Sequence, residues 1–369
     1  MLLWDIMKKI KNAVINSKLD EDVARDDRNI EGYQRLITPN EIRKNLQITQ
    51  TAISTVRDGR TTIKDSLRGK DKRIVLLCGP CSIHDNDAAE EYASKLKNLS
   101  EDVKDVFYII MRTFFEKPRT EIGWKGLIDD PDLKGMEGKN KGLFLARKLL
   151  LQNAEKGLPS GTEFLDPFVP QYISDLISWG GIGARTVESQ THRAMASGLS
   201  MPIGFKNSTN GNITVAINAV VVAKHRQEFF GSDLSGKITN ILSKGNDDAH
   251  IVLRGGNDGP NYNKEKVQEA LNKLKEKGLF EKLIIDCSHG NSKKDHNKQP
   301  EVFFDVIKQI YDGNTGIFGL MLESNIAEGR QEITSEELRY GVSVTDSCIG
   351  WDCTEEIVKE AAKILRRKN

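Results

Sequence analysis

Short apolar runs that end abruptly in polar residues recur along the chain. The segment 282–292, KLIIDCSHGNS, shows the form: Leu283, Ile284 and Ile285 precede Asp286 and the polar residues after it. This form is typical of a buried parallel strand that delivers side chains to a site at its end. Seven more runs share it, at 73–81, 107–113, 161–166, 182–186, 202–207, 250–256 and 317–324.

Helical patterns fill most of the intervals between these runs, for example at 87–99, 171–179, 215–225 and 264–277. Strands that alternate with helices indicate parallel βαβ units. Eight such units predict an α/β protein with a closed (β/α)8 TIM barrel, whose chemistry lies where the strands end. A doubly wound open sheet is the alternative, but the count of eight favours the barrel.

The segment 1–69 precedes the first predicted strand and forms an N-terminal extension to a catalytic barrel at 70–369. Its first 16 residues have the apolar spacing of an amphipathic helix, and residues 17–37 are charged and poor in apolar groups. Thr38-x-x-Glu41 predicts a capping box at the start of a helix, and a second helix is expected near 49–58.

Two long intervals interrupt the barrel pattern. Glycines around KITNILSK predict a small β-hairpin insertion near 227–249. The interval 113–160 contains FEKPRT and GWKG directly after a strand end. Long loops in compact domains are usually functional or disordered, so we expect this one to contact substrate.

Composition excludes several classes of protein. The 54 Lys and Arg residues nearly balance the 53 Asp and Glu residues, so the net charge of +1 favours neither nucleic acid nor an acidic membrane as a partner. The five cysteines are an odd number, which argues against a disulfide framework. The N-terminus does not resemble a secretory signal and no apolar run is long enough to span a bilayer, so we expect a cytoplasmic protein.

Four cations occupy matching positions at or just after the last apolar residue of the second, fourth, fifth and sixth strands. Any one of them is most simply explained by a structural ion pair, because a buried cation is costly without a partner. Four at equivalent ends of one barrel instead predict a site for a small, highly charged anion. They are Arg112, Arg185, Lys206 and Arg254, and Lys117 and Arg119 follow the second strand closely.

A second group of polar residues belongs to the first, seventh and eighth strands, which are neighbours in a closed barrel. One thiol, one imidazole and two carboxylates are suitable ligands for a divalent transition metal; they are Cys81, His289, Glu323 and Asp346. Cys78 and Cys81 also have the C-x-x-C spacing of redox or zinc motifs. Cys78 lies inside a strand run, however, and no second such pair exists.

Glu163 ends the third strand, between these two groups. It either pairs with a cation or positions a water or a proton, and the sequence does not separate the two roles.

The motifs at these positions resemble those of the class I (microbial) 3-deoxy-D-arabino-heptulosonate 7-phosphate (DAHP) synthases. They span the barrel in order: GPCSIHD (79–85), FEKPRT (115–120), GWKGLIDDPD (123–132), GARTVESQTHR (183–193), ASGLSMPIGFKN (196–207), LRGG (253–256), IDCSHGNS (285–292), MLESNIAEGRQ (321–331) and YGVSVTDSCIGW (340–351). The sequence departs from the usual pattern at Glu121, Val187 and Ser208-Thr209-Asn210.

The resemblance implies a transferase that condenses phosphoenolpyruvate with D-erythrose 4-phosphate and releases phosphate, the first step of the shikimate pathway to aromatic amino acids. It implies one divalent metal ion per subunit (Mn, Fe, Co, Zn or similar), held by Cys81, His289, Glu323 and Asp346. Phosphoenolpyruvate is expected at Arg112, Lys117, Glu163, Arg185, Lys206 and Arg254, and erythrose 4-phosphate at Lys117-Pro118-Arg119-Thr120. Ala184 and Asp346 are further expected substrate-binding residues. Lys117, His289 and Glu163 are the candidate catalytic groups, and the proton donor is either Lys117 or His289.

The resemblance also implies regulation and assembly. Additions to the barrel in this family form the interfaces of homodimers or homotetramers and a feedback site for an aromatic amino acid. Gln171, Ser200 and the hairpin match the region of that site, and the sequence context favours tyrosine over phenylalanine. The alternatives are another metal-dependent barrel aldolase or sugar-acid synthase, and a non-catalytic paralogue that binds a metabolite.

Overall fold

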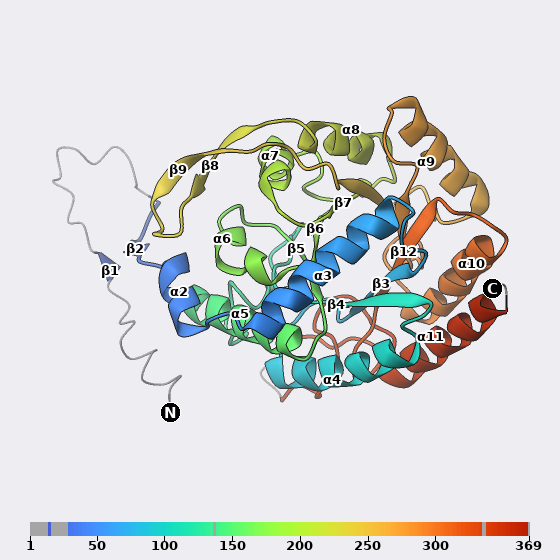
Figure 1. Ribbon diagram of the computed structural model, residues 1–369. Coiled ribbons are helices and arrows are strands. Elements are labelled where there is room, and N and C mark those ends of the chain that lie inside the picture. Colours follow the sequence, from blue (N-terminus) through green and yellow to red (C-terminus); the bar gives the residue numbers. More distant parts are fainter. Residues whose placement is uncertain (1–13, 16–28, 136–137, 334–336, 368–369) are drawn as a thin grey trace.

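A closed barrel of eight parallel strands forms the centre of the molecule (Figure 1). The computed structural model describes residues 14–15, 29–135, 138–333 and 337–367. In barrel order, beginning with the first strand of the chain, the strands are β3 (Ile74–Gly79), β4 (Phe107–Arg112), β5 (Ser160–Glu163), β6 (Trp179–Ile182), β7 (Ile203–Lys206), β10 (His250–Leu253), β11 (Leu283–Asp286) and β12 (Ile317–Glu323). The predicted (β/α)8 barrel is therefore confirmed.

Helices surround this barrel and connect its strands (Figure 1). They are α4 (Asn86–Asp102), α5 (Lys139–Glu155), α6 (Pro170–Ile173) with the short 3-10 helix η1 (Ser174–Leu176), α7 (Gln190–Gly198), α8 (Thr214–Ala223), α9 (Lys264–Glu276), η2 (His296–Lys298), α10 (Gln299–Tyr311) and α11 (Trp351–Arg366). No helix in the described part of the chain combines the length and apolar character needed to cross a bilayer.

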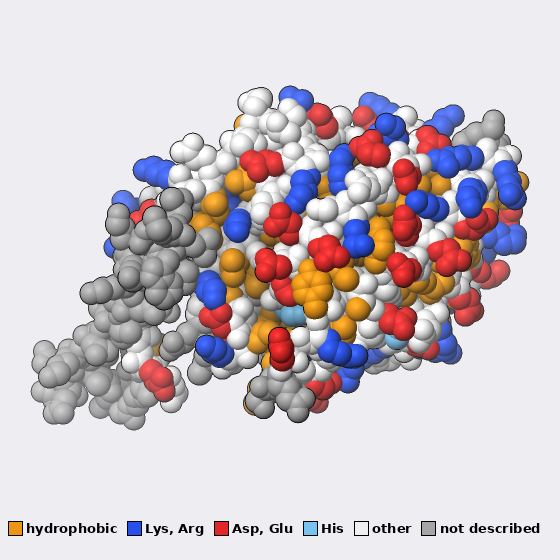
Figure 2. All heavy atoms as spheres, turned by 90° about the horizontal axis from the view of Figure 1, so that it is seen from below, with side chains coloured by type: hydrophobic (Ala, Val, Ile, Leu, Met, Phe, Trp, Pro, Cys, Tyr) orange, Lys and Arg blue, Asp and Glu red, His pale blue; other side chains and the backbone are white. Residues whose placement is uncertain are grey.

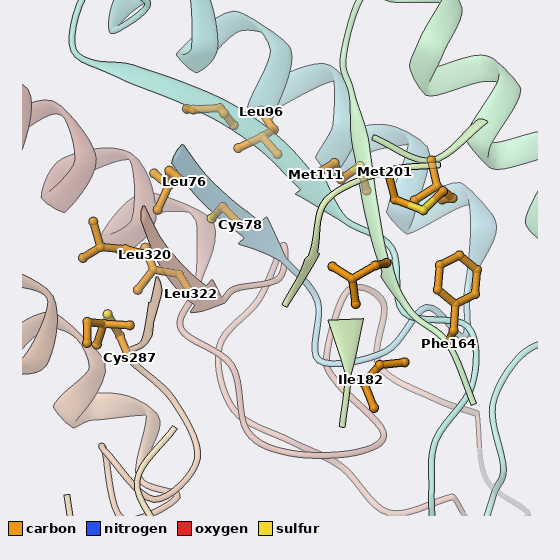
Figure 3. Close-up of a cluster of buried hydrophobic side chains, with 14 of the residues drawn as sticks. Leu76, Cys78, Leu96, Met111, Phe164, Ile182, Met201, Cys287, Leu320 and Leu322 are labelled. Carbon is orange, nitrogen blue, oxygen red and sulfur yellow. The ribbon is translucent and has the colours of Figure 1, made fainter. Parts of the chain in front are cut away.

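Strand alternation divides the apolar side chains into two cores. In β3, Leu76 and Cys78 belong to the outer core between barrel and helices, whereas Val75 and Leu77 belong to the barrel interior. Figure 3 shows Leu76 and Cys78 in the outer core, with Leu96 of α4. Because successive side chains of a strand point to opposite faces, uninterrupted apolar runs can fill both cores.

The helix α3 (Gln50–Leu67) is longer than the helix predicted near 49–58. The prediction ended before Gly59, but this glycine stays helical where α3 packs closely against the barrel: a Cβ there would lie 2.6 Å from Ser178 Oγ. One turn later, Ile63 and Leu67 join the interior cluster. This helix therefore closes the end of the barrel opposite the carboxyl ends of the strands.

The rest of the extension only partly follows the prediction. The capping box is present, with Thr38 and Glu41 bonded reciprocally at the start of α2 (Pro39–Asn45). The predicted amphipathic helix lies mostly outside the described residues. At Val14–Ile15 the helix prediction is wrong, because these residues form a strand, β1, paired with β2 (Tyr33–Gln34). Strand pairing satisfies their backbone without the helix that apolar spacing suggested.

The fourth barrel strand begins earlier than predicted. The segment 171–179 had a helical pattern, but only α6 and η1 are helical, and β6 starts at Trp179. Gly180 and Gly181 disguised the strand, since they carry no apolar side chain. They are needed for packing: a Cβ on Gly180 would lie 2.5 Å from Ile203 Cδ1, and one on Gly181 would lie 2.9 Å from the Trp179 ring.

The predicted hairpin is present as β8 (Glu228–Ser232) and β9 (Ile238–Leu242), which pair antiparallel. Its exposed apolar residues include Phe230, Ile238 and Leu242. The homodimer or homotetramer expected from the resemblance stays a prediction. On the face in Figure 2, basic and acidic side chains are interspersed, in keeping with the net charge of +1.

His250, which is buried in the barrel interior, should make the stability of the fold depend on pH. Its Nε2 accepts a hydrogen bond from Trp179 Nε1 at 3.1 Å, and burial lowers its pKa from 6.5 to about 4. The unfolded chain therefore binds more protons than the folded chain between these pKa values. Stability conferred by the neutral imidazole is lost as the pH falls through this window.

We predict that His250→Gln, which keeps an acceptor for Trp179, makes the free energy of unfolding less dependent on pH. From about pH 7 to about pH 5, wild type should lose about 2 kcal/mol more than the variant. Urea unfolding at both pH values measures this difference. Equal losses in the two proteins would contradict the assignment of a neutral buried imidazole.

Candidate active site

The carboxyl ends of the strands open into a cavity of about 580 Å³ that is lined mainly by polar and charged residues. Most of the residues singled out in the sequence line it: Lys117, Pro118, Arg119, Thr120, Glu163, Ala184, Arg185, Lys206, Arg254, His289 and Asp346. The structure thus brings together residues from the carboxyl ends of seven strands or the segments after them. Cys81, Arg112 and Glu323 lie beneath this surface and are fully buried.

Three of the four expected metal ligands form a compact cluster. The thiol of Cys81 and carboxylate oxygens of Glu323 and Asp346 all lie within 4.8 Å of one another. The barrel register explains part of this, because β12 pairs with β3 and sets Glu323 beside Gly79. Asp346 reaches the cluster from the segment between β12 and α11.

His289 approaches the cluster with each ring nitrogen facing a carboxylate. Its Nε2 lies 3.6 Å from Glu323 Oε1, while its Nδ1 faces Asp286 Oδ2 at 2.9 Å. The backbone at His289 has a φ of 56°, which is unusual for a residue with a side chain. A carboxylate behind a histidine orients the ring and leaves the other nitrogen for a metal.

Asp286 also contacts residues of the candidate site, although the sequence reasoning did not select it. It ends β11, is fully buried, and also lies 3.6 Å from Lys206 Nζ. Burial acts to raise the pKa of Asp286, but His289 and then Lys206 hold it well below its usual range. The signal was the first polar residue of IIDCSH, which the pattern marked only as the end of a strand.

The ligand cluster is electrostatically suited to a cation. Burial, and then the neighbouring Glu323, raise the pKa of the Cys81 thiol to about 11. Burial opposes ionisation of Glu323 as well, but His289 and Arg112 lower its pKa, and Lys117 and His289 do the same for Asp346. Two ionised carboxylates and a thiol at this spacing repel further negative charge, and a divalent ion among them would relieve that repulsion.

Cys78 takes no part in this cluster. Its side chain points to the outer core, where Sγ lies 3.2 Å from Tyr92 Oη, and all five cysteines are free. Cys78 and Cys81 therefore do not form a redox pair in this structure.

Arg112 does not reach the cavity surface. Its guanidinium donates to Glu323 Oε1 at 2.6 Å and to the carbonyls of Pro80 and Cys81, and it stacks 3.7 Å above the Phe114 ring. Arg112 thus forms an ion pair in this structure, and its expected role in binding phosphoenolpyruvate stays a prediction.

Lys206 and Glu163 form an ion pair at the centre of the site. Lys206 Nζ lies 3.1 Å from Glu163 Oε2. The two residues end β5 and β7, alternate strands whose side chains share a layer in a barrel. Burial would raise the pKa of Glu163, but Lys206 and Lys117 overcome this effect and lower it to about 2. Glu163 is therefore ionised at neutral pH.

Three arginines in the cavity have no carboxylate partner among the described residues. Arg254 is mostly buried, and its Nε has no hydrogen-bond partner. Arg185 Nε donates to Thr120 Oγ1 at 2.9 Å, and Arg119 Nε donates to the Trp124 carbonyl at 2.7 Å. The cavity therefore holds an excess of positive charge suited to an anion.

Lys293 and Lys294 also line the cavity, although the sequence reasoning did not select them. Both have positive φ values, 55° and 61°, directly after the turn of His289. Strained backbone of this kind is found preferentially at functional sites. The available signal was the pair of lysines that follows HGNS.

The two residues expected at an effector site lie apart from this cavity. Ser200 lines another cavity of about 390 Å³, with Leu199 before it and Ile241 and Leu242 of β9. Gln171 is in α6, where its carbonyl accepts a hydrogen bond from Arg43. It is not among the residues that line the Ser200 cavity.

Comparison with known proteins agrees with this geometry. A sequence model described as the DAHP synthetase I family matches residues 45–359. The chain is 48% identical over 329 residues to the Tyr-sensitive phospho-2-dehydro-3-deoxyheptonate aldolase of Escherichia coli K12, covering 89% of this chain and 92% of that protein. It is 48% identical over 333 residues to the Trp-sensitive enzyme of the same strain, covering 90% and 95%.

A solved structure gives the same result. Phospho-2-dehydro-3-deoxyheptonate aldolase from Francisella tularensis SCHU S4 superposes with a TM-score of 0.90 at 47% identity, covering 92% of this chain and all of that one. Residues 45–359, which the family model matches, contain all eight barrel strands and every residue of the cavity described above. The chain therefore belongs to the DAHP synthetase I family.

Proposed function

We propose that this protein condenses phosphoenolpyruvate with D-erythrose 4-phosphate and water to give DAHP and phosphate. The excess of cations in the cavity, and above all Arg254, whose Nε has no hydrogen-bond partner, supports this proposal most directly. Phosphoenolpyruvate carries a carboxylate and a phosphate on three carbons, so it has the compact, high negative charge that such a cavity suits. The similarity to enzymes named for this product supports the same reaction.

Arg185, Lys206 and Arg254 would bind phosphoenolpyruvate. They come from three consecutive barrel strands and all line the cavity. Arginine matches phosphate or carboxylate with two parallel donors, whereas lysine supplies a compact charge. Held in this way, the enol carbon has a fixed orientation and no water shell, which removes much of the entropic cost of reaction.

The loop 117–120 would bind the phosphorylated sugar. Arg119 and Thr120 line the cavity near its mouth, and Thr120 is joined to Arg185 through the hydrogen bond described above. This contact connects the two substrate sites, so each bound substrate would help to order the other. Lys293 and Lys294 add positive charge at the same opening.

A divalent metal would be held by Cys81, His289, Glu323 and Asp346, and this donor set and its spacing fit such an ion. When bound, the ion supplies Lewis acidity that polarises the aldehyde of the sugar. The ion and a proton would compete for the Cys81 sulfur, because a metal-bound thiol is deprotonated. The set of soft and hard donors accepts Mn, Fe, Co or Zn.

Lys117 is the better placed of the two candidate proton donors. Its Nζ lies 3.0 Å from the Cys81 carbonyl and 3.2 Å from Cys81 Sγ, and it lines the cavity. Both nitrogens of His289 already face carboxylates. We infer that Lys117 protonates the aldehyde oxygen as the enol carbon attacks the aldehyde carbon.

Glu163 would orient the water that completes the reaction. Carbon–carbon bond formation leaves positive charge on the carbon that carries the phosphate, and water adds there to form a hemiketal phosphate. Glu163 is ionised and beside the substrate cations, so it can accept a hydrogen bond from this water. Its pKa of about 2 makes it a weak base, so its role is orientation. The hemiketal phosphate then loses phosphate to give the product.

The direct test is an assay of the purified protein with both substrates. We expect phosphoenolpyruvate consumption and phosphate release that require erythrose 4-phosphate and a divalent metal, and that stop with a chelator. Cys81→Ala should abolish the activity because a ligand is lost. Cys78→Ala should keep most of it, because Cys78 packs outside the barrel.

Phosphate release without the sugar, or turnover only with another aldehyde, would contradict the proposed reaction. Equal loss of activity in the two cysteine variants would contradict the assignment of Cys81 as a ligand.

We propose further that tyrosine inhibits the enzyme by binding in the cavity beside Ser200. This cavity lies where the hairpin meets the C-terminus of α7: a Cβ on Gly198 would lie 3.4 Å from the Phe229 ring. Ser200 is three residues before β7, the strand that ends in Lys206. An effector that shifts β7 would therefore move Lys206, which is proposed to bind the substrate. The effector site and the substrate site would be coupled in this way.

We predict that Ser200→Leu, which fills part of this cavity, raises the tyrosine concentration for half-inhibition by roughly tenfold, equivalent to about 1.4 kcal/mol. The control is Ser94→Leu, on the outer surface of α4, where Ser94 bonds only within its helix. Initial rates with and without tyrosine, phenylalanine and tryptophan measure the effect. Inhibition of the Ser200 variant at the wild-type concentration would place the effector elsewhere.

A further inference from the structure

Two of the proposed metal ligands, Cys81 and Asp346, each have a neighbour in sequence with a buried hydroxyl. Ser82 follows Cys81, and Thr345 precedes Asp346. The Ser82 Oγ and Thr345 Oγ1 atoms are only 2.7 Å apart, although 263 positions separate the residues in sequence. Ser82 is fully buried and Thr345 is 8% exposed. One hydrogen bond between side chains thus joins the two segments that carry Cys81 and Asp346.

A second contact joins the same segments on the other side of Asp346. The Cys81 amide donates to Cys348 Sγ at 3.4 Å. The hydroxyl contact itself is extended by Ser343, whose Oγ accepts from the Thr345 amide at 3.2 Å. Asp346 is therefore held between two attachments to the segment of Cys81, one at Thr345 and one at Cys348.

Asp346 needs such support more than Glu323 and Cys81 do. Glu323 ends a barrel strand and Cys81 closely follows one, whereas Asp346 lies in the connection between β12 and α11. In its described part, this connection forms no strand, and its strand-like pairing is limited to isolated bridges such as Ser324 with Ile349 and Gly329 with Cys348. Asp346 also lies close to the ionised Glu323. Like charge favours separation of the two carboxylates when no cation is bound.

We propose that the Ser82–Thr345 hydroxyl pair positions Asp346 for the metal and so sets the affinity of the site for divalent cations. This inference rests on the proposed function, because that proposal assigns Cys81 and Asp346 as ligands. Neither hydroxyl belongs to the ligand set, so both act through the residues beside them. Partners that orient metal ligands typically change metal affinity by about 10–100-fold when removed.

The competing explanation is an ordinary buried hydrogen bond that stabilises the fold alone. The chain contains a matched example: Ser197 Oγ lies 2.6 Å from Ser243 Oγ, also buried, where α7 meets the hairpin. Loss of this control pair should lower the thermal midpoint without changing metal binding. Loss of the Ser82–Thr345 pair should change metal binding by more than its effect on the fold explains.

The test is a titration of the full-length, metal-free protein with Co²⁺, followed by the thiolate-to-cobalt absorption band. Thr345→Val removes the hydroxyl and keeps the shape, and Ser82→Ala removes it from the other side. Each should weaken Co²⁺ binding by about tenfold or more. Thr345→Ser, which retains the hydroxyl, and Ser197→Ala should both bind within about twofold of wild type.

The double variant adds a check on the pair. Ser82→Ala with Thr345→Val should bind Co²⁺ about as tightly as either single variant, since each single change already breaks the contact. Thermal midpoints of the metal-free variants show whether each has folded. The two single variants test one contact from both sides, so a variant that fails to fold leaves the other to decide.

Wild-type Co²⁺ affinity in Thr345→Val and Ser82→Ala would overturn the inference, as would an equal loss in Thr345→Ser and Thr345→Val. Cys81→Ala separates this failure from failure of the proposed function. If Cys81→Ala loses the absorption band and the affinity while the hydroxyl variants keep both, only the positioning role falls. If Cys81→Ala binds Co²⁺ like wild type, the assigned metal site falls and this inference falls with it.

Discussion

An excess of positive charge around the cavity at one end of the barrel is the constraint on which the site depends. Glu323 balances Arg112, and Glu163 and Asp286 balance Lys206. Arg254 is left with an unbonded Nε in a mostly buried position. Burying a charge without a partner is costly, so this arrangement is explained if a ligand completes it. Under the proposed function, a compact dianion or trianion is that ligand.

The barrel makes this arrangement possible because its apolar interior stabilises the fold, while the charged side chains are confined to the strand ends. The lower part of the interior is filled with apolar side chains, including Trp179 and Phe318, and is closed by Ile63 and Leu67 of α3. The charged side chains occupy only the layer above, at the strand ends. Because the strands are held by register and by two apolar cores, they can tolerate the electrostatic cost at one end. The metal ligands depend on this rigidity only in part, since Asp346 lies outside the strands.

The sequence predicted the barrel and most cavity residues because strand ends are marked by a change from apolar to polar residues. It misplaced the fourth strand, where Gly180 and Gly181 provide space instead of apolar side chains. It also could not show that Arg112 faces Glu323 below the cavity. Strand alternation predicts which face of a strand a side chain occupies, but not how far below the cavity surface it lies. The sequence also did not reveal the contacts of Asp286 with His289 and of Ser82 with Thr345. Asp, Ser and Thr residues occur in many structural roles, so their presence alone does not indicate these contacts. Only three-dimensional distances distinguish them.

Direct measurement of phosphoenolpyruvate binding tests the central claim, which is that the Arg254 guanidinium binds this anion. Isothermal titration would compare wild type, Arg254→Ala and a control, Arg68→Ala, which breaks an ion pair of Arg68 with Asp248 far from the cavity. Arg254→Ala should lose about 1.5–3 kcal/mol of binding free energy without loss of thermal stability, whereas Arg68→Ala should bind like wild type. An Arg254→Ala protein that is destabilised but binds phosphoenolpyruvate with wild-type affinity would contradict the account.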